Sequence, residues 1–191
     1  MFFFACLALR MHYFCSQYFT TMKIVLIGYM ASGKSALARD ISAAWSLKLL
    51  DLDQIIEKEE GESISEIIFN KGELYFRRKE RAMLEVLLEE DNFVLATGGG
   101  TPCYYDNMTL INSKAASFYL KHNIPILFER LRKDRRERPL LAHLKDEDLK
   151  EFIAKHLFER SVYYEQAIFT LDSKLAKDGA YLREMQKLLK D

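Results

Sequence analysis

Residues 23–35 read Lys-Ile-Val-Leu-Ile-Gly-Tyr-Met-Ala-Ser-Gly-Lys-Ser, and this stretch decides the fold. Its apolar first part has the length of a buried strand, and it runs directly into the spacing G-x-x-x-x-G-K-S. Residues 36–41 continue with helical spacing. A strand, a glycine-rich loop and a helix in this order are typical of a phosphate-binding loop, because the loop N–H groups and the positive end of the helix dipole face one point.

Four residues of this loop have expected roles. Gly28 and Gly33 allow the tight turn, Lys34 reaches the outer phosphates of a nucleotide, and Ser35 offers its hydroxyl to Mg²⁺. The alternative is a glycine-rich turn between a strand and a helix that binds nothing. Because the strand and the helix lie where a phosphate-binding loop requires them, the sequence favours nucleotide binding.

The bulk composition is that of an ordinary globular protein. The 191 residues are 49% hydrophobic, which suffices for one domain with a sizeable core. Acidic and basic residues number 28 each, and this balance argues against general electrostatic binding to nucleic acid or to a membrane surface. The three cysteines match neither a disulfide framework nor a metal-ligand spacing, so we expect free thiols and a cytoplasmic location.

Residues 1–21 differ from the rest of the chain. They begin with an apolar run and continue with aromatic residues that show no clear period. The run is too short to span a bilayer, and it lacks the basic residues that precede the apolar part of a secretory signal. We therefore expect a start-site artefact or a disordered extension over residues 1–21, a native start at Met22, and a single domain over residues 22–191.

The remainder of the chain alternates between short apolar runs and segments of helical spacing. Ser63 and Glu66 predict a capping box at a helix start, Gly72 interrupts that helix, and residues 73–90 carry one apolar face. The alternation predicts a parallel sheet with helices on both faces and ligands at the carboxyl ends of the strands. The apolar runs that we expect to be strands after residues 23–27 are 47–53, 93–97, 116–120 and 167–171.

Asp51 and Asp53 close the second of these expected strands. Side chains two positions apart on an extended strand share a face, so one carboxylate could face a metal ion while the other faces a substrate. Two solvated carboxylates at a strand end are the alternative interpretation.

A run of charged residues covers positions 129–138 and leads into Pro139. A solvated helix face is the ordinary interpretation of such a run. Beside a phosphate-binding loop, the same run also suits a lid that carries arginine over a transferring phosphoryl group.

Six motifs stand in order along the chain. They are the loop at 28–35, Asp51-Leu-Asp53, Gly72-Glu73-Leu-Tyr-Phe76-Arg77 with Glu80, Gly98-Gly99-Gly100, Arg138-Pro139-Leu140-Leu141, and Arg160 with Tyr164. The ordered set resembles the motifs of the shikimate kinase family, and the resemblance extends from Met22 almost to the C-terminus. It implies a P-loop kinase fold: a five-stranded parallel sheet with helices on both faces, a small substrate-binding helical insertion and an arginine-bearing lid.

The resemblance implies ATP-dependent phosphorylation of the shikimate 3-hydroxyl, which gives shikimate 3-phosphate and ADP. Asp53 would contact the substrate hydroxyls and act as base or orienting group, together with Lys34 and Arg138 as catalytic cations. Ser35 would bind Mg²⁺ directly and Asp51 through water. The residues implied in ATP binding are Ala31, Ser32, Gly33, Lys34, Ser35, Ala36 and Arg138.

The resemblance also implies a site for the substrate carboxylate. Arg77 and Arg160 would grip that carboxylate, since a planar guanidinium offers paired N–H donors. Gly98, Gly99 and Gly100 would bring backbone N–H groups close to the substrate. In isolation, Arg77 would be interpreted as a surface residue of a charged helix, and Tyr164 and Phe76 as packing residues.

Some positions depart from the family pattern. Ala31 stands where the family usually has glycine, and Cys103 has no assigned role. The arginine that stacks near adenine in some members has only candidates here, which are Arg130, Arg132 and Lys133.

Alternatives to this function stay open at this point. They are a kinase of gluconate or of a nucleoside monophosphate on the same scaffold, and a non-catalytic nucleotide-binding protein. We expect small-molecule partners, no nucleic acid, no membrane and a monomer.

Overall fold

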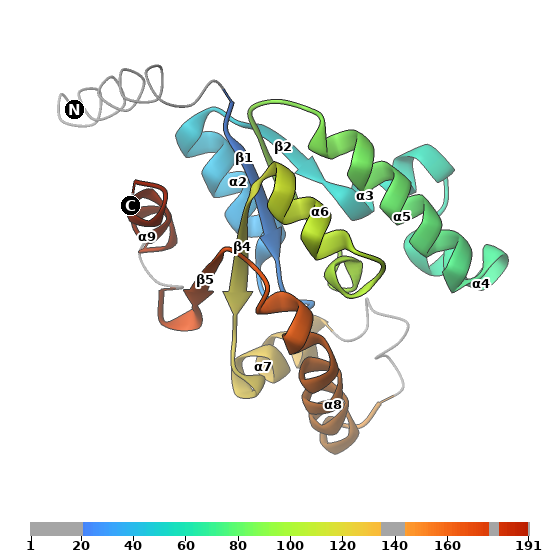
Figure 1. Cartoon of the computed structure of the whole chain (residues 1–191). Coiled ribbons are helices and arrows are strands. Elements are labelled where there is room, and N and C mark those ends of the chain that lie inside the picture. Colours follow the sequence, from blue (N-terminus) through green and yellow to red (C-terminus); the bar gives the residue numbers. More distant parts are fainter. Residues whose placement is uncertain (1–20, 135–143, 176–179, 191) are drawn as a thin grey trace.

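The computed structural model of the chain describes residues 21–134, 144–175 and 180–190. Five strands form one parallel sheet in the order β2-β3-β1-β4-β5, with β1 at its centre (Figure 1). The strands are β1 (Lys23–Ile27), β2 (Lys48–Asp51), β3 (Phe93–Ala96), β4 (Ala116–Lys121) and β5 (Phe169–Asp172). The expected strands are therefore all present, with ends that shift by up to two residues, because strand ends are weakly marked in a sequence.

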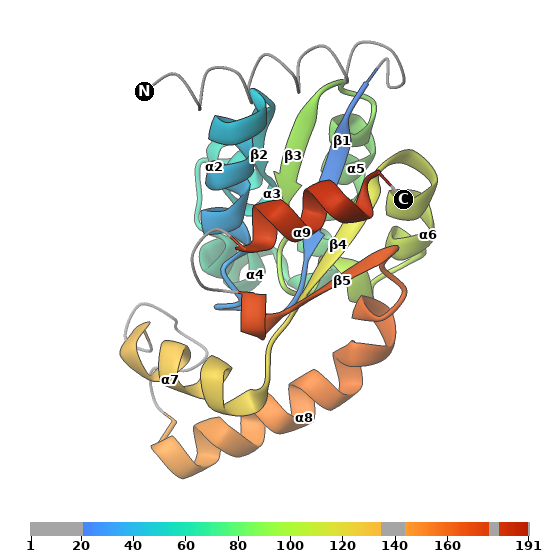
Figure 2. The same ribbon diagram turned by 90° about the vertical axis from the view of Figure 1, so that its left-hand side faces the viewer.

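Helices cover both faces of the sheet. α2 and α9 lie side by side on one face (Figure 2), whereas α3, α5 and α6 lie on the other and α7 and α8 lie beyond the carboxyl ends of the strands (Figure 1). The helices are α2 (Lys34–Trp45), α3 (Leu52–Glu60), α4 (Ile64–Lys71), α5 (Glu73–Leu88), α6 (Asn107–Lys114), α7 (Ile124–Asp134), α8 (Asp146–Tyr164) and α9 (Ala180–Leu188); two short 3₁₀ helices are η1 (Thr101–Cys103) and η3 (Ser173–Leu175).

The apolar run of β1 is explained by burial on both faces of the sheet. Ile24 and Leu26 belong to the cluster beneath α2 and α9, while Val25 and Ile27 belong to the cluster on the opposite face. All four side chains are fully buried. A parallel strand with helices on both sides needs apolar residues at successive positions rather than at alternate ones.

The expected second strand is too long at its end. β2 ends at Asp51, and Asp53 lies in the first turn of α3. The Asp51 carboxylate caps this helix by accepting a hydrogen bond from Gln54 N at 3.3 Å, and the buried side chains of Leu52 and Ile56 follow helical spacing. The prediction that both aspartates share one face of an extended strand is therefore wrong.

The helical insertion between β2 and β3 is built from α3, α4 and α5. The capping box between Ser63 and Glu66 is present at the start of α4, as predicted. Gly72 separates α4 from α5 at φ +86°, a conformation that favours glycine.

Two predicted segments lie outside the described residues. They are the N-terminal extension as far as residue 20, and the lid segment 135–143 with Arg138, Pro139, Leu140 and Leu141. The charged run up to position 134 is the end of α7. Among the helices that the structure describes, none has the length and apolar character needed to cross a membrane.

Candidate active site

The loop between β1 and α2 has the backbone conformation that its glycines predict. Gly28 and Gly33 have φ values of +144° and +96°. A Cβ at Gly28 would lie 3.0 Å from the carbonyl oxygen of Leu120 on the neighbouring strand, so the loop passes too close to β4 for a side chain. Ala31 has a φ of +59°, which costs an alanine about 1 kcal/mol and gives a physical reason for glycine at this position in the family.

Two cations contact the carbonyl groups of this loop. Lys34 Nζ donates to the carbonyl oxygens of Gly28 at 2.9 Å and Tyr29 at 3.0 Å. Arg130 Nη1, from α7, donates to Ala31 O at 2.9 Å and to Ser32 O at 3.0 Å. Arg130 is one of the three candidates for the arginine near adenine, and its guanidinium contacts the carbonyl groups of the loop.

Ser35 and Asp51 form the predicted oxygen pair. Ser35 Oγ donates to Asp51 Oδ2 at 2.8 Å, so the first turn of α2 and the end of β2 meet at this point. Hydroxyl and carboxylate oxygens are the ligands that Mg²⁺ prefers.

One cavity of about 620 Å³ joins the phosphate-binding loop to the predicted acceptor residues. It lies at the carboxyl ends of β1, β2 and β3, as expected for a parallel sheet. Ser32 is buried outside its lining, and Arg138 lies outside the described residues. The predicted site residues that line the cavity are Ala31, Gly33, Lys34, Ser35, Ala36, Asp51, Asp53, Arg77, Gly98, Gly99, Gly100 and Arg160.

Asp53 is a half-buried carboxyl group with a shifted pKa. Burial raises the pKa of Asp53 from 3.8 to about 6, and the charges of Glu80 and Asp51 add to the rise while Lys34 opposes it. A carboxylate with this pKa is ionised at neutral pH and is a stronger base than a solvated one.

Arg77 is buried, so its interpretation as a surface residue is wrong. Its exposed fraction is 9%. Nη1 donates to Glu80 Oε2 at 2.8 Å, and Nη2 lies 3.3 Å from Glu73 Oε1. Arg160, from α8, lines the same cavity as Arg77.

The triple glycine is required by close approach from three sides. A Cβ at Gly98 would lie 2.7 Å from Asp53 Oδ1, and one at Gly100 would lie 2.7 Å from Arg77 Nη2. At Gly99 the nearest atom to such a Cβ is a backbone nitrogen of the phosphate-binding loop, at 3.2 Å. The segment therefore packs directly against the nucleotide and acceptor parts of the cavity.

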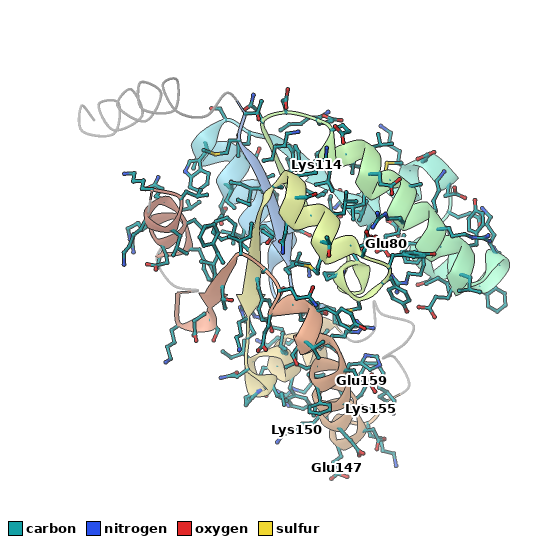
Figure 3. The ribbon with its side chains drawn as sticks, in the orientation of Figure 1. Glu80, Lys114, Glu147, Lys150, Lys155 and Glu159 are labelled. Carbon is teal, nitrogen blue, oxygen red and sulfur yellow. The ribbon has the colours of Figure 1, made fainter. Side chains whose placement is uncertain are left out.

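Sequence reasoning missed the partners of these residues. Glu80 is 1% exposed and contacts both Arg77 and Thr101. In Figure 3, Glu80 lies inside the molecule, whereas the labelled charges on α8 point outward. From the sequence, Glu80 was named only as part of a motif and had no assigned role, although its position three residues after Arg77 on a helix predicts a contact between the two side chains.

The structure adds to the packing role expected for Tyr164, and it gives a place to Cys103, which had no assigned role. Tyr164 is fully buried, and its hydroxyl donates to the carbonyl oxygen of Gly99 at 2.5 Å, so it anchors the glycine segment as well as packing. Burial raises the pKa of the Cys103 thiol to about 11. That thiol stays protonated at neutral pH and packs against the core.

The fold and the cavity define a class of protein. In a parallel sheet of this kind, a nucleotide binds at the loop after the central strand, and the cavity leaves room beside that loop for a second small molecule. The chain has the architecture of a P-loop kinase of small molecules.

The family follows from comparison with known proteins. The family model described as shikimate kinase matches residues 30–190. Shikimate kinase of Flavobacterium johnsoniae is 48% identical over 164 residues, covering 85% of this chain and 93% of the relative. The chain belongs to the shikimate kinase family and is a kinase, which confirms the resemblance.

Solved structures agree with this assignment. Shikimate kinase from Bacteroides thetaiotaomicron matches with a TM-score of 0.85 and 33% identity, over 90% of this chain and all of that one. Shikimate kinase from Acinetobacter baumannii in complex with shikimate matches with a TM-score of 0.77 and 29% identity, over 90% of this chain and 92% of that one. The predicted fold class, a parallel sheet of five strands between helices, is confirmed.

Proposed function

We propose that this chain transfers the terminal phosphoryl group of ATP to the 3-hydroxyl of shikimate and releases shikimate 3-phosphate and ADP. The observation that carries the proposal is the single cavity in which Lys34 and Asp53 share walls with Arg77 and Arg160. The relative from Acinetobacter baumannii that was solved in complex with shikimate supports this substrate.

The acceptor half of the cavity suits a hydroxylated ring acid. Arg77 and Arg160 supply guanidinium groups for a carboxylate, and the Gly98–Gly100 backbone lies between Arg77 and the loop. Asp53 accepts the proton of the hydroxyl that attacks phosphorus, or orients that hydroxyl, and its pKa of about 6 fits this task at neutral pH.

We infer a Mg²⁺ site at Ser35 and Asp51. The Ser35 hydroxyl binds the ion directly and the Asp51 carboxylate binds through water, in agreement with their contact at 2.8 Å. The described residues contain no cluster of three or more His, Cys, Asp or Glu side chains suited to a metal. A site with only two protein ligands, Ser35 and Asp51, fits Mg²⁺ in a kinase because the phosphates of the substrate complete the coordination. The ion would neutralise the charge of these phosphates during transfer.

The nucleotide half begins at residues 31–36. Lys34 exchanges its contacts with the loop carbonyls for the outer phosphates, and Arg138 closes over them from the lid segment. The base lies on the β4 and β5 side, because the acceptor occupies the β2 and β3 side of β1. A second cavity of about 330 Å³ at the ends of β4 and β5 can hold it, with His122, Asn123, Ile126 and Asp172 in its lining.

An ADP-release assay with several acceptors tests the substrate. Shikimate, gluconate and nucleoside monophosphates are offered side by side with ATP and Mg²⁺. We expect turnover with shikimate alone, and mass spectrometry of the product should place one added phosphate on it. Turnover of gluconate or of a nucleotide without turnover of shikimate would overturn the assignment.

We also propose that the enzyme acts as a monomer in the cytoplasm. The cavity joins the loop residues to Asp53, Arg77 and Arg160 within one chain, so we expect the chemistry to need no second copy. The free thiol of Cys103 suits a reducing compartment. Light scattering of the enzyme as it leaves a size-exclusion column measures its mass. A dimer at the concentration used for the assay would contradict the proposed monomer.

A further inference from the structure

The segment after the triple glycine contacts the group that orients Arg77. We propose that Thr101 and Tyr104 are positioning residues, which fix the Arg77 guanidinium in the direction needed for the acceptor carboxylate. Thr101 acts through Glu80, and Tyr104 acts through the face of its ring. The inference rests on the proposed function, since Arg77 is there assigned to the acceptor.

Thr101 controls one oxygen of the Glu80 carboxylate. Its hydroxyl is fully buried and donates to Glu80 Oε1 at 2.5 Å, and the other oxygen, Oε2, accepts from Arg77 Nη1 at 2.8 Å. Glu80 itself is 1% exposed, so the loss of either partner leaves a buried carboxylate oxygen without its donor. A carboxylate held at both oxygens has one orientation, and that orientation is passed to the guanidinium.

Three oxygen atoms converge on the position of Gly98. A Cβ there would lie 2.7 Å from Asp53 Oδ1, 3.0 Å from Thr101 Oγ1 and 3.1 Å from Glu80 Oε1. The Thr101 hydroxyl is the donor among these three when both carboxylates are ionised. Without it, Glu80 would turn an uncompensated oxygen towards Asp53, and the ion pair with Arg77 would lose its fixed geometry.

Tyr104 holds the plane of the same guanidinium. The Arg77 Cζ atom lies 4.0 Å from the centre of the Tyr104 ring, within the range of a cation–π contact. The Tyr104 hydroxyl donates to Glu73 Oε1 at 2.6 Å, and that oxygen also lies 3.3 Å from Arg77 Nη2. Ring and carboxylate together restrict rotation of the guanidinium.

The backbone of the segment is itself anchored. Asn107 Nδ2 donates to Thr101 O at 2.7 Å, and Arg81 Nη1 donates to Asn107 Oδ1 at 2.8 Å. Cys103 N donates to Gly100 O at 2.8 Å and closes the short helix η1. Thr101 and Tyr104 therefore start from fixed backbone positions, as residues that orient another side chain must.

Paired substitutions separate the hydroxyl and the ring from simple packing. Thr101→Val removes the hydroxyl and keeps the shape, whereas Thr101→Ser keeps the hydroxyl. Tyr104→Leu removes the ring, whereas Tyr104→Phe keeps it. The matched controls are Thr109→Val, on the exposed side of α6, and Tyr105→Leu, at a side chain that is 56% exposed.

KM for shikimate, KM for ATP and kcat are measured for all six variants of the full chain. We expect Thr101→Val to raise KM for shikimate about tenfold and Tyr104→Leu about fivefold. KM for ATP should stay within about twofold of the wild type, and the Ser and Phe variants should recover most of the loss.

The outcomes are distinct. A wild type that does not phosphorylate shikimate overturns the proposed function. An active wild type with an unchanged KM in Thr101→Val, or with Ser as damaging as Val, overturns the role of Thr101 and leaves the proposed function intact. If Thr101→Val does not fold, the Tyr104 pair decides: equal effects of Leu and Phe, or no effect of Leu, overturn the inference.

Discussion

Asp53 and Glu80 are a half-buried and a fully buried carboxylate that face each other across Gly98. A Cβ at that glycine would lie 2.7 Å from Asp53 Oδ1 and 3.1 Å from Glu80 Oε1. The two carboxylates can approach each other this closely because residue 98 has no side chain. Arg77 compensates Glu80 but not Asp53. The repulsion therefore falls on Asp53, which is the residue that needs basicity.

The first prediction concerns the stability of this arrangement. The folded-state pKa of Asp53, about 6, lies above the unfolded value of 3.8. The folded state therefore binds the proton more tightly, and the ionised carboxylate destabilises the protein at pH values above 6. We expect Asp53→Asn to lower kcat at least about a hundredfold and to raise the free energy of unfolding at pH 8 by roughly 1–3 kcal/mol.

Urea unfolding at pH 8 and pH 4 measures the change in the free energy of unfolding. Near pH 4 Asp53 is already protonated in the folded wild type, so the increase in the free energy of unfolding caused by Asp53→Asn should disappear. Asp40→Asn, at an exposed position of α2, is the control and should show neither change. Wild-type turnover in Asp53→Asn would remove this residue from the chemistry.

The second prediction concerns the pH dependence of turnover. Because Asp53 must be ionised to accept a proton, kcat should fall as the pH drops through about 6. The acid limb should be missing in Asp53→Asn, whose residual rate depends on no carboxylate at this position. A wild-type acid limb near pH 4 would show that Asp53 is better solvated in the complex than in the free enzyme.

The third prediction concerns the paired N–H donors of the Arg77 guanidinium group. Arg77→Lys keeps a charge beside Glu80 but loses the planar pair of donors. We expect KM for shikimate to rise about ten- to a hundredfold, with KM for ATP unchanged. Arg78→Lys, at the exposed neighbouring position, is the control. An equal rise of both KM values would indicate a general disturbance of the cavity.

The fourth prediction compares two glycines. Gly98→Ala places a methyl group against Asp53 Oδ1 and should lower kcat, because the carboxylate must move away from the acceptor. Gly61 has a φ of +70° and no atom within 4 Å of an added Cβ. Gly61→Ala should therefore cost about 1 kcal/mol of stability and leave kcat unchanged. Equal kcat values in both variants would contradict the close approach at Gly98.

The parts of the fold that are local in the chain could be predicted from the sequence. The strand, loop and helix over residues 23–45 follow from periodicity and glycine positions, and the capping box at Ser63 marks α4. The parallel sheet follows from the alternation of such segments.

The contacts of the site depend on distant residues, and they could not be predicted in this way. Asp53 was expected on a strand because apolar residues surround it, but capping by Asp51 starts the helix one residue after β2. The burial of Glu80 could not be derived from its charge, since its partners Arg77 and Thr101 come together only when η1 packs on α5. The contact of Arg130 with the loop likewise could not be predicted, because it depends on the position of α7 beside the loop.

The fifth prediction concerns this contact of Arg130 with the phosphate-binding loop. The guanidinium binds the carbonyl groups of Ala31 and Ser32, so it holds the loop N–H groups towards the cavity and the positive φ of Ala31 in place. Arg130→Met should raise KM for ATP about five- to tenfold, with KM for shikimate unchanged. Methionine keeps the apolar part of the arginine side chain, but it lacks the N–H groups that donate to the loop. Arg78→Met, at an exposed residue of α5 that does not line the cavity, is the matched control. If Arg130 instead contacted the base, the variant would lose its preference for ATP over GTP, whereas a loop contact lowers the affinity for both nucleotides equally.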